Sequence, residues 1–286
     1  MITNMQVSGN ADIRVEERLF QVGGITVNIR QVPHASMKRA PLLDPSQSLT
    51  WVEDAEVLNQ QATGTNERLC LLAASSGSVD QSSQAPDVID SLMDVGLVTW
   101  QAGIILTELL LLTQPCGDWR GSTVIDLGCG TGLLGISLSL AGASVTMTDL
   151  PYILQLTSYN VKVNTEFYAL SSMPVLVAHS WGDQATAAAL CSAPDLIAAA
   201  DVLYNPECYG ALLKTLSMLC APHTLVYIAW KKRHESEEVF PLLAEDCGFA
   251  VDMVPTDDLA AEYKGGVTIL KLTFLAKIVA ESDVFE

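Results

Sequence analysis

Basic residues are scarce in this chain of 286 residues, which has 15 lysines and arginines against 33 aspartates and glutamates and a formal net charge of -18. A protein that follows a nucleic-acid backbone needs a basic surface to contact the phosphates. The charge balance therefore argues against a nucleic-acid partner. It favours basic partners instead, lysine-rich proteins among them.

Several other patterns are missing. The seven cysteines form no C-x-x-C pair and the four histidines lack the spacing of metal ligands, so we expect reduced cysteines and no metal site. No G-x-S-x-G nucleophile elbow is present. Residues 1–12 contain no hydrophobic signal core, and the most apolar stretch, residues 104–112, is too short to span a bilayer. We therefore expect a monomer without membrane contact, in the cytoplasm and with the nucleus as a second location.

Composition and periodicity divide the chain into four segments. Residues 1–15 are expected to form a flexible tail. Residues 16–33 alternate around Gly23-Gly24, which predicts a β-hairpin. Residues 34–95 lose periodicity and are rich in Ser, Gln, Asp, Thr and Gly, which predicts a polar, partly disordered insertion. Residues 96–280 carry regular strand and helix patterns and are expected to form the main domain.

Strand and helix patterns alternate within the main domain. Thr99 has the character of an N-cap, with Trp100 opening a helix. The alternation predicts a doubly wound α/β fold, in which a ligand binds beyond the carboxyl ends of the strands. The expected strands are 124–127, 143–148, 174–179, 195–202, 225–230, 249–254 and 267–275, and further helices are expected at 133–141, 151–164, after 206 and at 235–247.

A glycine-dense loop follows the first of these strands. From Asp126 to Gly135 the sequence is DLGCGTGLLG, in which glycines allow close approach of a ligand and the free N–H groups of the next helix attract electron-rich atoms. Residues 130–135 satisfy the G-x-G-x-x-G pattern of a dinucleotide site, which suits NAD. The frame Asp126-x-Gly128-x-Gly130-x-Gly132 instead resembles motif I of the S-adenosylmethionine-dependent methyltransferases. Asp126 would repel a pyrophosphate but attract a sulfonium or ammonium group, and we favour S-adenosylmethionine for this reason.

Asp149 and Trp181 follow strands on the same expected edge, and Trp100 opens the helix that precedes the glycine-bearing strand. Asp149 lies about twenty residues after the glycine turn, where a carboxylate can accept both ribose hydroxyls, although it could also cap the helix at Pro151. Trp181 follows the third strand and could pack on an adenine. Trp100 could form a wall of the same pocket. For both indoles, core packing is an equally good interpretation.

Asp201 interrupts the apolar fourth strand near its carboxyl end, and a buried carboxylate needs a partner. Tyr204 follows one turn later and can point into the same cleft. Together they could hold a substrate amine, while the alternative is a helix-entry turn with an incidental aspartate. The only basic run, Lys231–His234, is expected to be a solvated face.

Residues 96–275 resemble the family 16 seven-β-strand methyltransferases, the methyltransferase-like protein-lysine methyltransferases. Besides the glycine loop, the resemblance rests on Trp100–Gly103, Val145–Asp149, Ser180–Gly182 and Ala200–Tyr204, the last being similar to the Asp-x-x-Tyr motif of this group. It implies a Rossmann-like, doubly wound seven-stranded sheet of the class I methyltransferases with an N-terminal β-hairpin. Asp126 and Cys129 stand where relatives often carry Glu and Ala.

The resemblance also implies a function: methyl transfer from S-adenosylmethionine to a lysine of a protein substrate, such as a chaperone or a translation factor, by SN2 displacement. Asp201 and Tyr204 would be the catalytic residues that capture and orient the amine. A methyltransferase for a histidine or a small molecule, a non-catalytic module that binds S-adenosylmethionine, and more remotely a dehydrogenase stay open. The cofactor site would be lined by Trp100, Asp126, Gly128, Cys129, Gly130, Asp149, Trp181 and Ala200.

Overall fold

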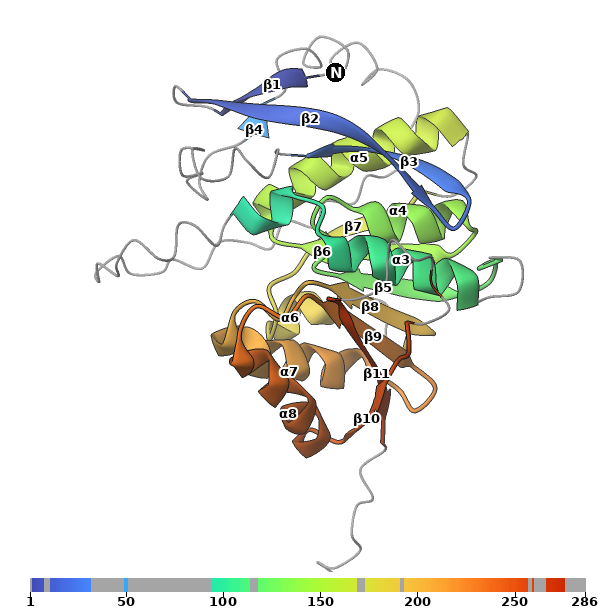
Figure 1. The fold of residues 1–286 in the computed structure, drawn as a ribbon, viewed down its shortest axis with the longest axis vertical. Coiled ribbons are helices and arrows are strands. Elements are labelled where there is room, and N and C mark those ends of the chain that lie inside the picture. The colour runs from blue at the N-terminus through green and yellow to red at the C-terminus, as the bar shows by residue number, and fades with distance from the viewer. Residues whose placement is uncertain are drawn as a thin grey trace, which may run out of the picture.

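The computed structural model describes residues 2–7, 11–31, 49–50, 94–113, 118–168, 173–190, 193–256, 259 and 266–275. A seven-stranded sheet in the order β10-β11-β9-β8-β5-β6-β7 forms its centre, so the predicted doubly wound α/β fold is confirmed (Figure 1). Its strands are β5 (Thr123–Leu127), β6 (Ser144–Asp149), β7 (Val175–Ala178), β8 (Leu196–Ala200), β9 (Leu225–Trp230), β10 (Phe249–Met253) and β11 (Thr268–Phe274).

Helices connect these strands on both faces of the sheet. They are η2 (Asp94–Leu97), α3 (Gln101–Thr113), α4 (Leu133–Leu140), α5 (Pro151–Tyr168), α6 (Gln184–Ala187), η4 (Pro206–Cys208), α7 (Tyr209–Leu219), η5 (Glu235–Val239) and α8 (Phe240–Asp246). None of the helices described is long and apolar enough to cross a membrane.

Strand order reverses beside β5, which pairs in parallel with both β6 and β8. From this point the chain winds outward in two directions, ending on one side with the antiparallel strands β11 and β10. The crevice at the carboxyl ends of β5 and β8 is where open α/β sheets bind their ligands. The topology thus brings together the loops that follow these two strands.

The strands are buried on both faces, which explains their nearly continuous apolar sequences. Neighbouring residues of β5 show this division: Val124 packs in a core with α3, α4, α5 and the hairpin, whereas Ile125 packs in a second core with α7 and α8. The sheet therefore forms a rigid floor from which the loops at its carboxyl edge project.

The predicted hairpin is confirmed, with β2 (Ala11–Val22) and β3 (Ile25–Gln31) joined at Gly23 and Gly24, whose φ angles are 51° and 78°. Positive φ at both turn positions matches the twist of the strands and requires glycine-like residues. Where we expected a tail over residues 1–15, β2 begins at Ala11 and pairs with β1 (Ile2–Val7). Antiparallel strands pair through backbone hydrogen bonds, so the pairing can extend past the residues whose alternating side chains predict a hairpin. The insertion predicted at 34–95 lies outside the described residues, apart from β4 (Leu49–Thr50) and residues 94–95.

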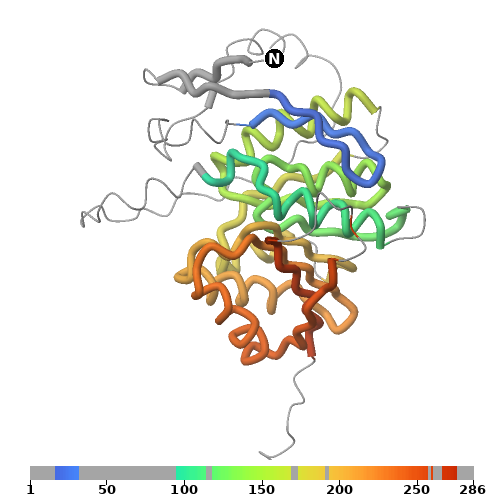
Figure 2. The backbone as a smooth tube through the Cα atoms, viewed as in Figure 1, coloured from blue at the N-terminus to red at the C-terminus, as the bar shows by residue number. Residues whose placement is uncertain are grey.

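Two asparagines of α5 bind the outer edge of β3, and Figure 2 shows this helix running beside the hairpin. The Asn164 side chain accepts a hydrogen bond from the Asn28 N–H at 2.8 Å and donates to the Asn28 carbonyl at 2.7 Å. Asn160 makes the same pair of bonds with Arg30, at 2.8 and 3.0 Å, and also donates to the Thr131 carbonyl in the glycine loop at 2.9 Å. Side-chain amides thus replace a neighbouring strand, and they attach the hairpin to the main domain.

Replacing Asn164 with alanine is expected to lower the free energy of unfolding by about 1–3 kcal/mol, because two backbone groups of Asn28 lose their partners. Urea unfolding followed by circular dichroism measures this loss. Glu166→Ala is the matched control, since this side chain is exposed on the same helix. Equal stability of the two variants would show that the asparagine bonds do not hold the hairpin.

The start of α3 differs from the prediction. The Trp100 carbonyl, not that of Thr99, accepts the first helical bonds, from Gly103 at 3.0 Å and Ile104 at 3.4 Å. Thr99 as N-cap was therefore wrong. Its hydroxyl bonds with that of Thr131 at 2.7 Å, because the glycine loop lies closer to it than the free N–H groups of the helix.

Candidate functional site

A pocket with a volume of about 360 Å³ opens at the carboxyl ends of β5, β6 and β8. This volume lies within the usual range of small-molecule sites. All of the site residues predicted from the sequence line it, so the structure brings together groups that are up to about a hundred positions apart. These residues are Trp100, Asp126, Gly128, Cys129, Gly130, Asp149, Trp181, Ala200, Asp201 and Tyr204.

The glycine loop between β5 and α4 forms the floor of the pocket. The N–H groups of Gly128 and Cys129 both donate to the Thr148 carbonyl at 2.9 Å, which holds the loop against β6. Gly130 has a φ of 53°, and a Cβ there would lie 3.1 Å from the Gly96 carbonyl oxygen. A side chain at this position would both strain the backbone and press on η2. Glycine is therefore required for the loop to pass this close to the segment before α3.

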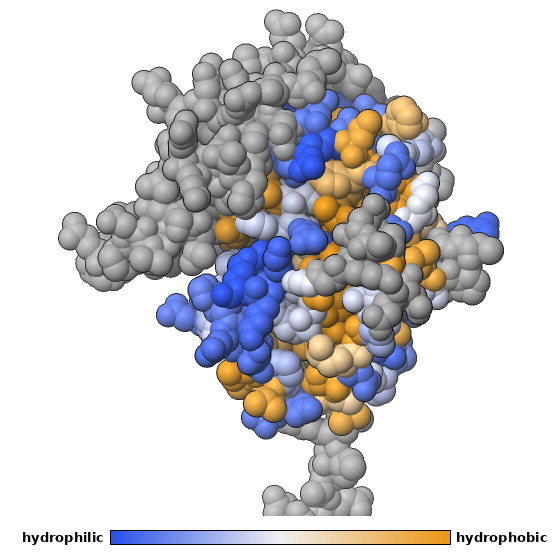
Figure 3. Space-filling view, in the orientation of Figure 1, coloured by the Kyte–Doolittle hydropathy of each residue, from blue (hydrophilic) through white to orange (hydrophobic). Residues whose placement is uncertain are grey.

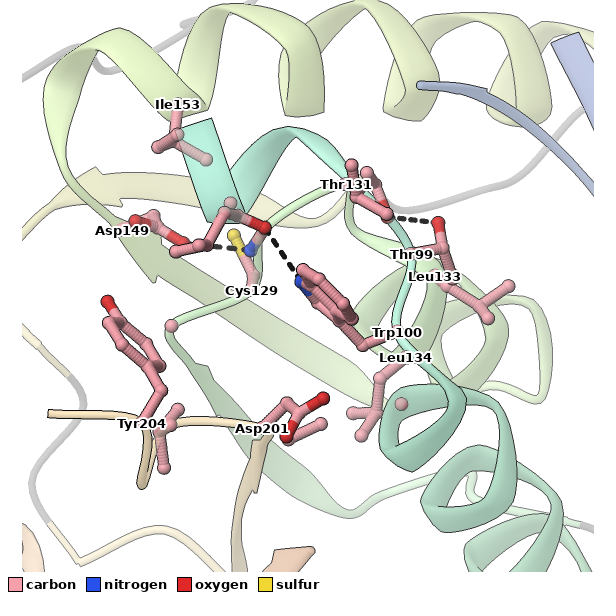
Figure 4. A pocket seen from close by; sticks show the side chains of 18 of the residues that line it. Thr99, Trp100, Cys129, Thr131, Leu133, Leu134, Asp149, Ile153, Asp201 and Tyr204 are labelled. Atoms are coloured by element: carbon pink, nitrogen blue, oxygen red, sulfur yellow. Dashed lines mark hydrogen bonds between the residues drawn. The ribbon is translucent and has the colours of Figure 1, made fainter. Parts of the chain in front are cut away.

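Two carboxylates border the glycine loop. Asp149, at the end of β6, accepts hydrogen bonds from the Gly130 N–H at 2.8 Å and the Leu150 N–H at 2.7 Å, one on each oxygen. Asp126, in β5, accepts one from the Gly135 N–H in the first turn of α4 at 2.9 Å. Both side chains therefore fix backbone around the pocket, and Asp149 retains lone pairs that face its interior (Figure 4).

Burial raises the pKa of both carboxyl groups, because a charged form loses hydration in the protein interior. The pKa of Asp126 rises to about 7, with the Asp149 charge adding to the effect. The pKa of Asp149 rises to about 6, and the hydrogen bonds that its carboxylate accepts from the backbone N–H groups of Gly130 and Leu150 limit this rise. A cation placed between these carboxylates would favour their charged forms and be bound in turn.

We expected Asp201 to lie within the fourth strand. In the structure that strand, β8, ends at Ala200, and Asp201 follows directly after it. Its φ is 59°, a conformation rare for residues other than glycine and associated with functional sites. Both of its side-chain oxygens bond with the Arg233 guanidinium, at 2.7 and 2.8 Å. Only 4% of the Asp201 side chain is exposed, so this ion pair supplies the partner that a buried carboxylate needs.

The basic run 231–234 is exposed to solvent, as predicted, but two of its members also line the pocket, which was not predicted. Arg233 and His234 line the pocket, while Lys232 points away and pairs with Glu238. The reason lies in the sheet: β8 and β9 are parallel neighbours that end together, so residues following β9 lie beside residues following β8. The sequence predicts both strands and their ends but not that they pair, so it carries no signal that would identify Arg233.

Aromatic side chains form the walls. The Trp100 indole donates to the Val95 carbonyl at 2.8 Å, and the Arg233 guanidinium lies over its ring at 5.0 Å. Trp181 lies so close to Gly128 that a Cβ there would be 3.3 Å from the indole edge. Figure 4 shows the Tyr204 phenol pointing toward the side of the pocket where Asp149 lies. Both indoles therefore belong to the pocket rather than to the core alone.

Burial, with the Asp149 charge adding to it, raises the pKa of Tyr204 to about 12. Its phenol is therefore protonated at neutral pH and cannot act as a base there.

The donor set fits S-adenosylmethionine. Asp149 can accept the ribose hydroxyls and the carboxylates of Asp126 and Asp149 favour a cation, whereas apolar groups such as Val98, Leu134 and Ile153 can cover the rest of the molecule. The described lining residues offer a single guanidinium, and it is already bound to Asp201, so little remains to balance a pyrophosphate. The charge argument made from Asp126 thus extends to the whole pocket.

Comparison with known proteins gives a family model and relatives that each match about half of the chain. A family model described as lysine methyltransferase matches residues 88–246. The chain is 39% identical over 144 residues to EEF1A lysine methyltransferase 3 of Xenopus tropicalis, a match that covers 50% of this chain and 61% of that protein. It is 31% identical over 153 residues to protein N-lysine methyltransferase METTL21A of Mus musculus, covering 54% of this chain and 68% of that protein.

The chain thus spans less than two thirds of the Xenopus relative that it matches. Among solved structures, magnesium protoporphyrin IX methyltransferase from Synechocystis PCC 6803 with bound SAM matches with a TM-score of 0.45 and 20% identity, covering 68% of this chain and 86% of that one.

Proposed function

Because the chain belongs to the lysine methyltransferase family, we propose that it transfers a methyl group from S-adenosylmethionine to a lysine side chain of a protein. The observation that carries this proposal is a pocket that brings two chemically different groups of residues together. Asp149 and the glycine loop suit a ribose. Asp201 and Tyr204, which follow β8, suit an amine, and this part of the pocket is called the amine end.

S-adenosylmethionine, when bound, supplies a methyl group on a positively charged sulfur, which a neutral amine can attack in line. A free lysine has a pKa near 10.4, so losing its proton costs about 4–5 kcal/mol at pH 7. Tyr204 holds its own proton and can accept a hydrogen bond from the amine, which orients the nitrogen lone pair. The proton of the ammonium group leaves to bulk water in this scheme.

Tyr204→Phe is expected to lower kcat about tenfold, because the amine loses one orienting hydrogen bond of about 1.4 kcal/mol. The affinity for S-adenosylmethionine should stay within twofold of the wild type. Tyr209→Phe is the control, because its hydroxyl donates to the Leu203 carbonyl at 2.9 Å outside the pocket. Equal kcat values for the wild type and Tyr204→Phe would remove the tyrosine from the reaction.

The function is tested by transfer of labelled methyl groups from S-adenosylmethionine to a cell extract and to purified EEF1A, the protein in the name of the Xenopus relative. We expect a discrete labelled protein with the wild type and with Asp183→Ala, whose side chain caps α6 and bonds Thr186 outside the pocket. The Asp149→Ala variant should label nothing. A wild type that binds S-adenosylmethionine but labels no protein would favour a small-molecule methyltransferase or a non-catalytic binding module.

We also propose that the chain acts as a monomer on a chaperone or a translation factor, in the cytoplasm and the nucleus. A protein substrate is supported by the names of the relatives. A reducing compartment is supported by Cys129, Cys208, Cys220 and Cys247, which are free thiols in the described part of the chain. Analytical ultracentrifugation and imaging of a tagged chain test these two points, and a dimer or a secreted protein would contradict them.

A further inference from the structure

Arg233 lies at the amine end of the pocket in a position that its contacts fix on three sides. Its guanidinium binds both oxygens of Asp201 and stacks over the Trp100 ring at 5.0 Å. Its backbone N–H donates to the buried Glu237 carboxylate at 2.9 Å. Figure 3 shows hydrophilic side chains gathered over the loop after β9, and Arg233 is the member of the run 231–233 that lines the pocket.

A bare Asp201 would work against methyl transfer. Its carboxylate is almost fully buried, so its charge is poorly screened. An opposite charge within a few ångströms typically shifts a pKa by about 1–3 units toward the charged form. An ammonium group has no lone pair with which to attack a methyl group. An uncompensated carboxylate would therefore bind the substrate lysine well and hold it in its unreactive form.

On the basis of the proposed function, we infer that Arg233 is a positioning residue that neutralises Asp201, so that Asp201 can shape the amine end of the pocket without holding the substrate lysine in its protonated state. The bidentate geometry matters, because the guanidinium engages both oxygens and its charge offsets that of the carboxylate toward a substrate ammonium group. Stacking on Trp100 keeps the guanidinium in this place when substrate enters. Arg233 thus also sets specificity, since it makes the site suited to a neutral nucleophile.

Other titratable groups face the same space. Asp126, Cys129 and Asp149 lie on the glycine-loop side, Tyr204 follows β8, and His234 follows β9. The Glu237 carboxylate accepts the backbone N–H of Arg233, and the backbone nitrogen of Lys231 lies 3.4 Å from Oδ1 of Asp201. The Arg233→Gln substitution leaves all of these groups in the sequence, so a difference between variants in pH dependence reports the balance between Asp201 and Arg233.

The first test is the pH profile of kcat for Arg233→Gln, measured with the protein that the wild type labels in extract. We expect kcat at pH 7.5 to fall about tenfold, and the pH at which log kcat levels off to rise by about one unit. The double variant Asp201→Asn with Arg233→Gln removes both charges and should restore the wild-type pH profile. A uniform loss at every pH, or a profile that the double variant fails to restore, would overturn the inference in favour of a purely structural role.

The second test needs no protein substrate. Calorimetry compares the affinities for S-adenosylmethionine, a cation at sulfur, and S-adenosylhomocysteine, which lacks that charge. An exposed Asp201 charge in Arg233→Gln should raise the preference for the cation several-fold, and the double variant should return it to the wild-type ratio. An unchanged ratio would overturn the inference.

The two proposals can fail separately. Failure of the wild type to label any protein refutes the proposed function alone. Arg233→Lys keeps the positive charge and provides the comparison if Arg233→Gln does not fold. We expect it to keep the wild-type ratio of the affinities for S-adenosylmethionine and S-adenosylhomocysteine. A shifted ratio in Arg233→Lys would count against charge compensation.

Discussion

Asp149→Asn is expected to weaken S-adenosylmethionine binding about 100-fold at pH 7.5, which corresponds to about 3 kcal/mol. Asp149 presents one oxygen to the Gly130 N–H and the other to the Leu150 N–H. An asparagine has one acceptor oxygen, so its amide must turn N–H groups toward one of these donors or toward the ribose. The variant therefore loses both the charge offered to the ligand and the conformation of the loop.

Calorimetry gives the affinity, and thermal unfolding without ligand shows whether the fold is intact. Asp183→Asn is the matched control, because Asp183 is also an aspartate that follows a strand of this sheet. Its side chain caps α6 and bonds Thr186 outside the pocket. Its affinity should equal that of the wild type. Wild-type affinity in Asp149→Asn would place the ribose elsewhere and would contradict the assignment of this end of the pocket.

The position of Asp149 was predictable because it depends on local order in the sequence. A strand, a polar residue and a helix-starting proline place a carboxylate at the carboxyl edge of any parallel sheet. The same reasoning located Trp181 and Tyr204. Residues defined by their place after a strand could therefore be assigned to one pocket without knowledge of strand order.

Arg233 could not be identified in this way because its role depends on a partner 32 positions away. A run of charged residues has the same sequence pattern whether it faces water or a neighbouring loop. The order of β8 and β9 decides between these possibilities, and composition does not report strand order. Asn160 and Asn164 are similar cases, since polar residues on a helix become anchors only when a strand edge lies beside them.

The expectation that Asp201 captures a lysine also changes, because the partner of Asp201 is likewise distant in the sequence. The sequence showed that a buried carboxylate requires a partner, and a substrate amine was one candidate. In the structure the partner is Arg233, which engages both oxygens. Tyr204 is therefore the group that we expect to contact the amine, with Asp201 and Arg233 forming the neutral wall beside it.

Asp126 is expected to make the folded protein less stable as the pH rises. Burial raises its pKa from 3.8 to about 7, so between these values the folded chain holds a proton that the unfolded chain has lost. The stabilisation is fully present below about pH 4 and is lost as the pH approaches 7. Three units at about 1.36 kcal/mol each give a loss of about 4 kcal/mol.

Asp126→Asn should remove this loss, because the amide stays neutral and its carbonyl can still accept the Gly135 N–H. In urea unfolding we expect the variant's advantage in stability over the wild type to be about 2–3 kcal/mol larger at pH 8 than at pH 5, because at pH 5 the wild type has lost less than half of the stabilisation. Asp195→Asn is the control: the backbone N–H of Thr123 lowers the pKa of Asp195, so that variant should differ from the wild type equally at both pH values. An Asp126→Asn effect that does not change with pH would contradict a raised pKa.

The same substitution should weaken binding of S-adenosylmethionine more than that of S-adenosylhomocysteine, because only the former carries a charge for Asp126 to attract. Wild-type affinity for the cation should rise as the pH passes from 6 to 7, following the pKa values of about 6 for Asp149 and about 7 for Asp126. This rise should be smaller in Asp126→Asn. A carboxylate that destabilises the empty protein at neutral pH while strengthening cofactor binding is the trade expected of a functional residue. If the variant gained stability without losing preference for the cation, Asp126 would have no part in cofactor binding beyond its bond to α4.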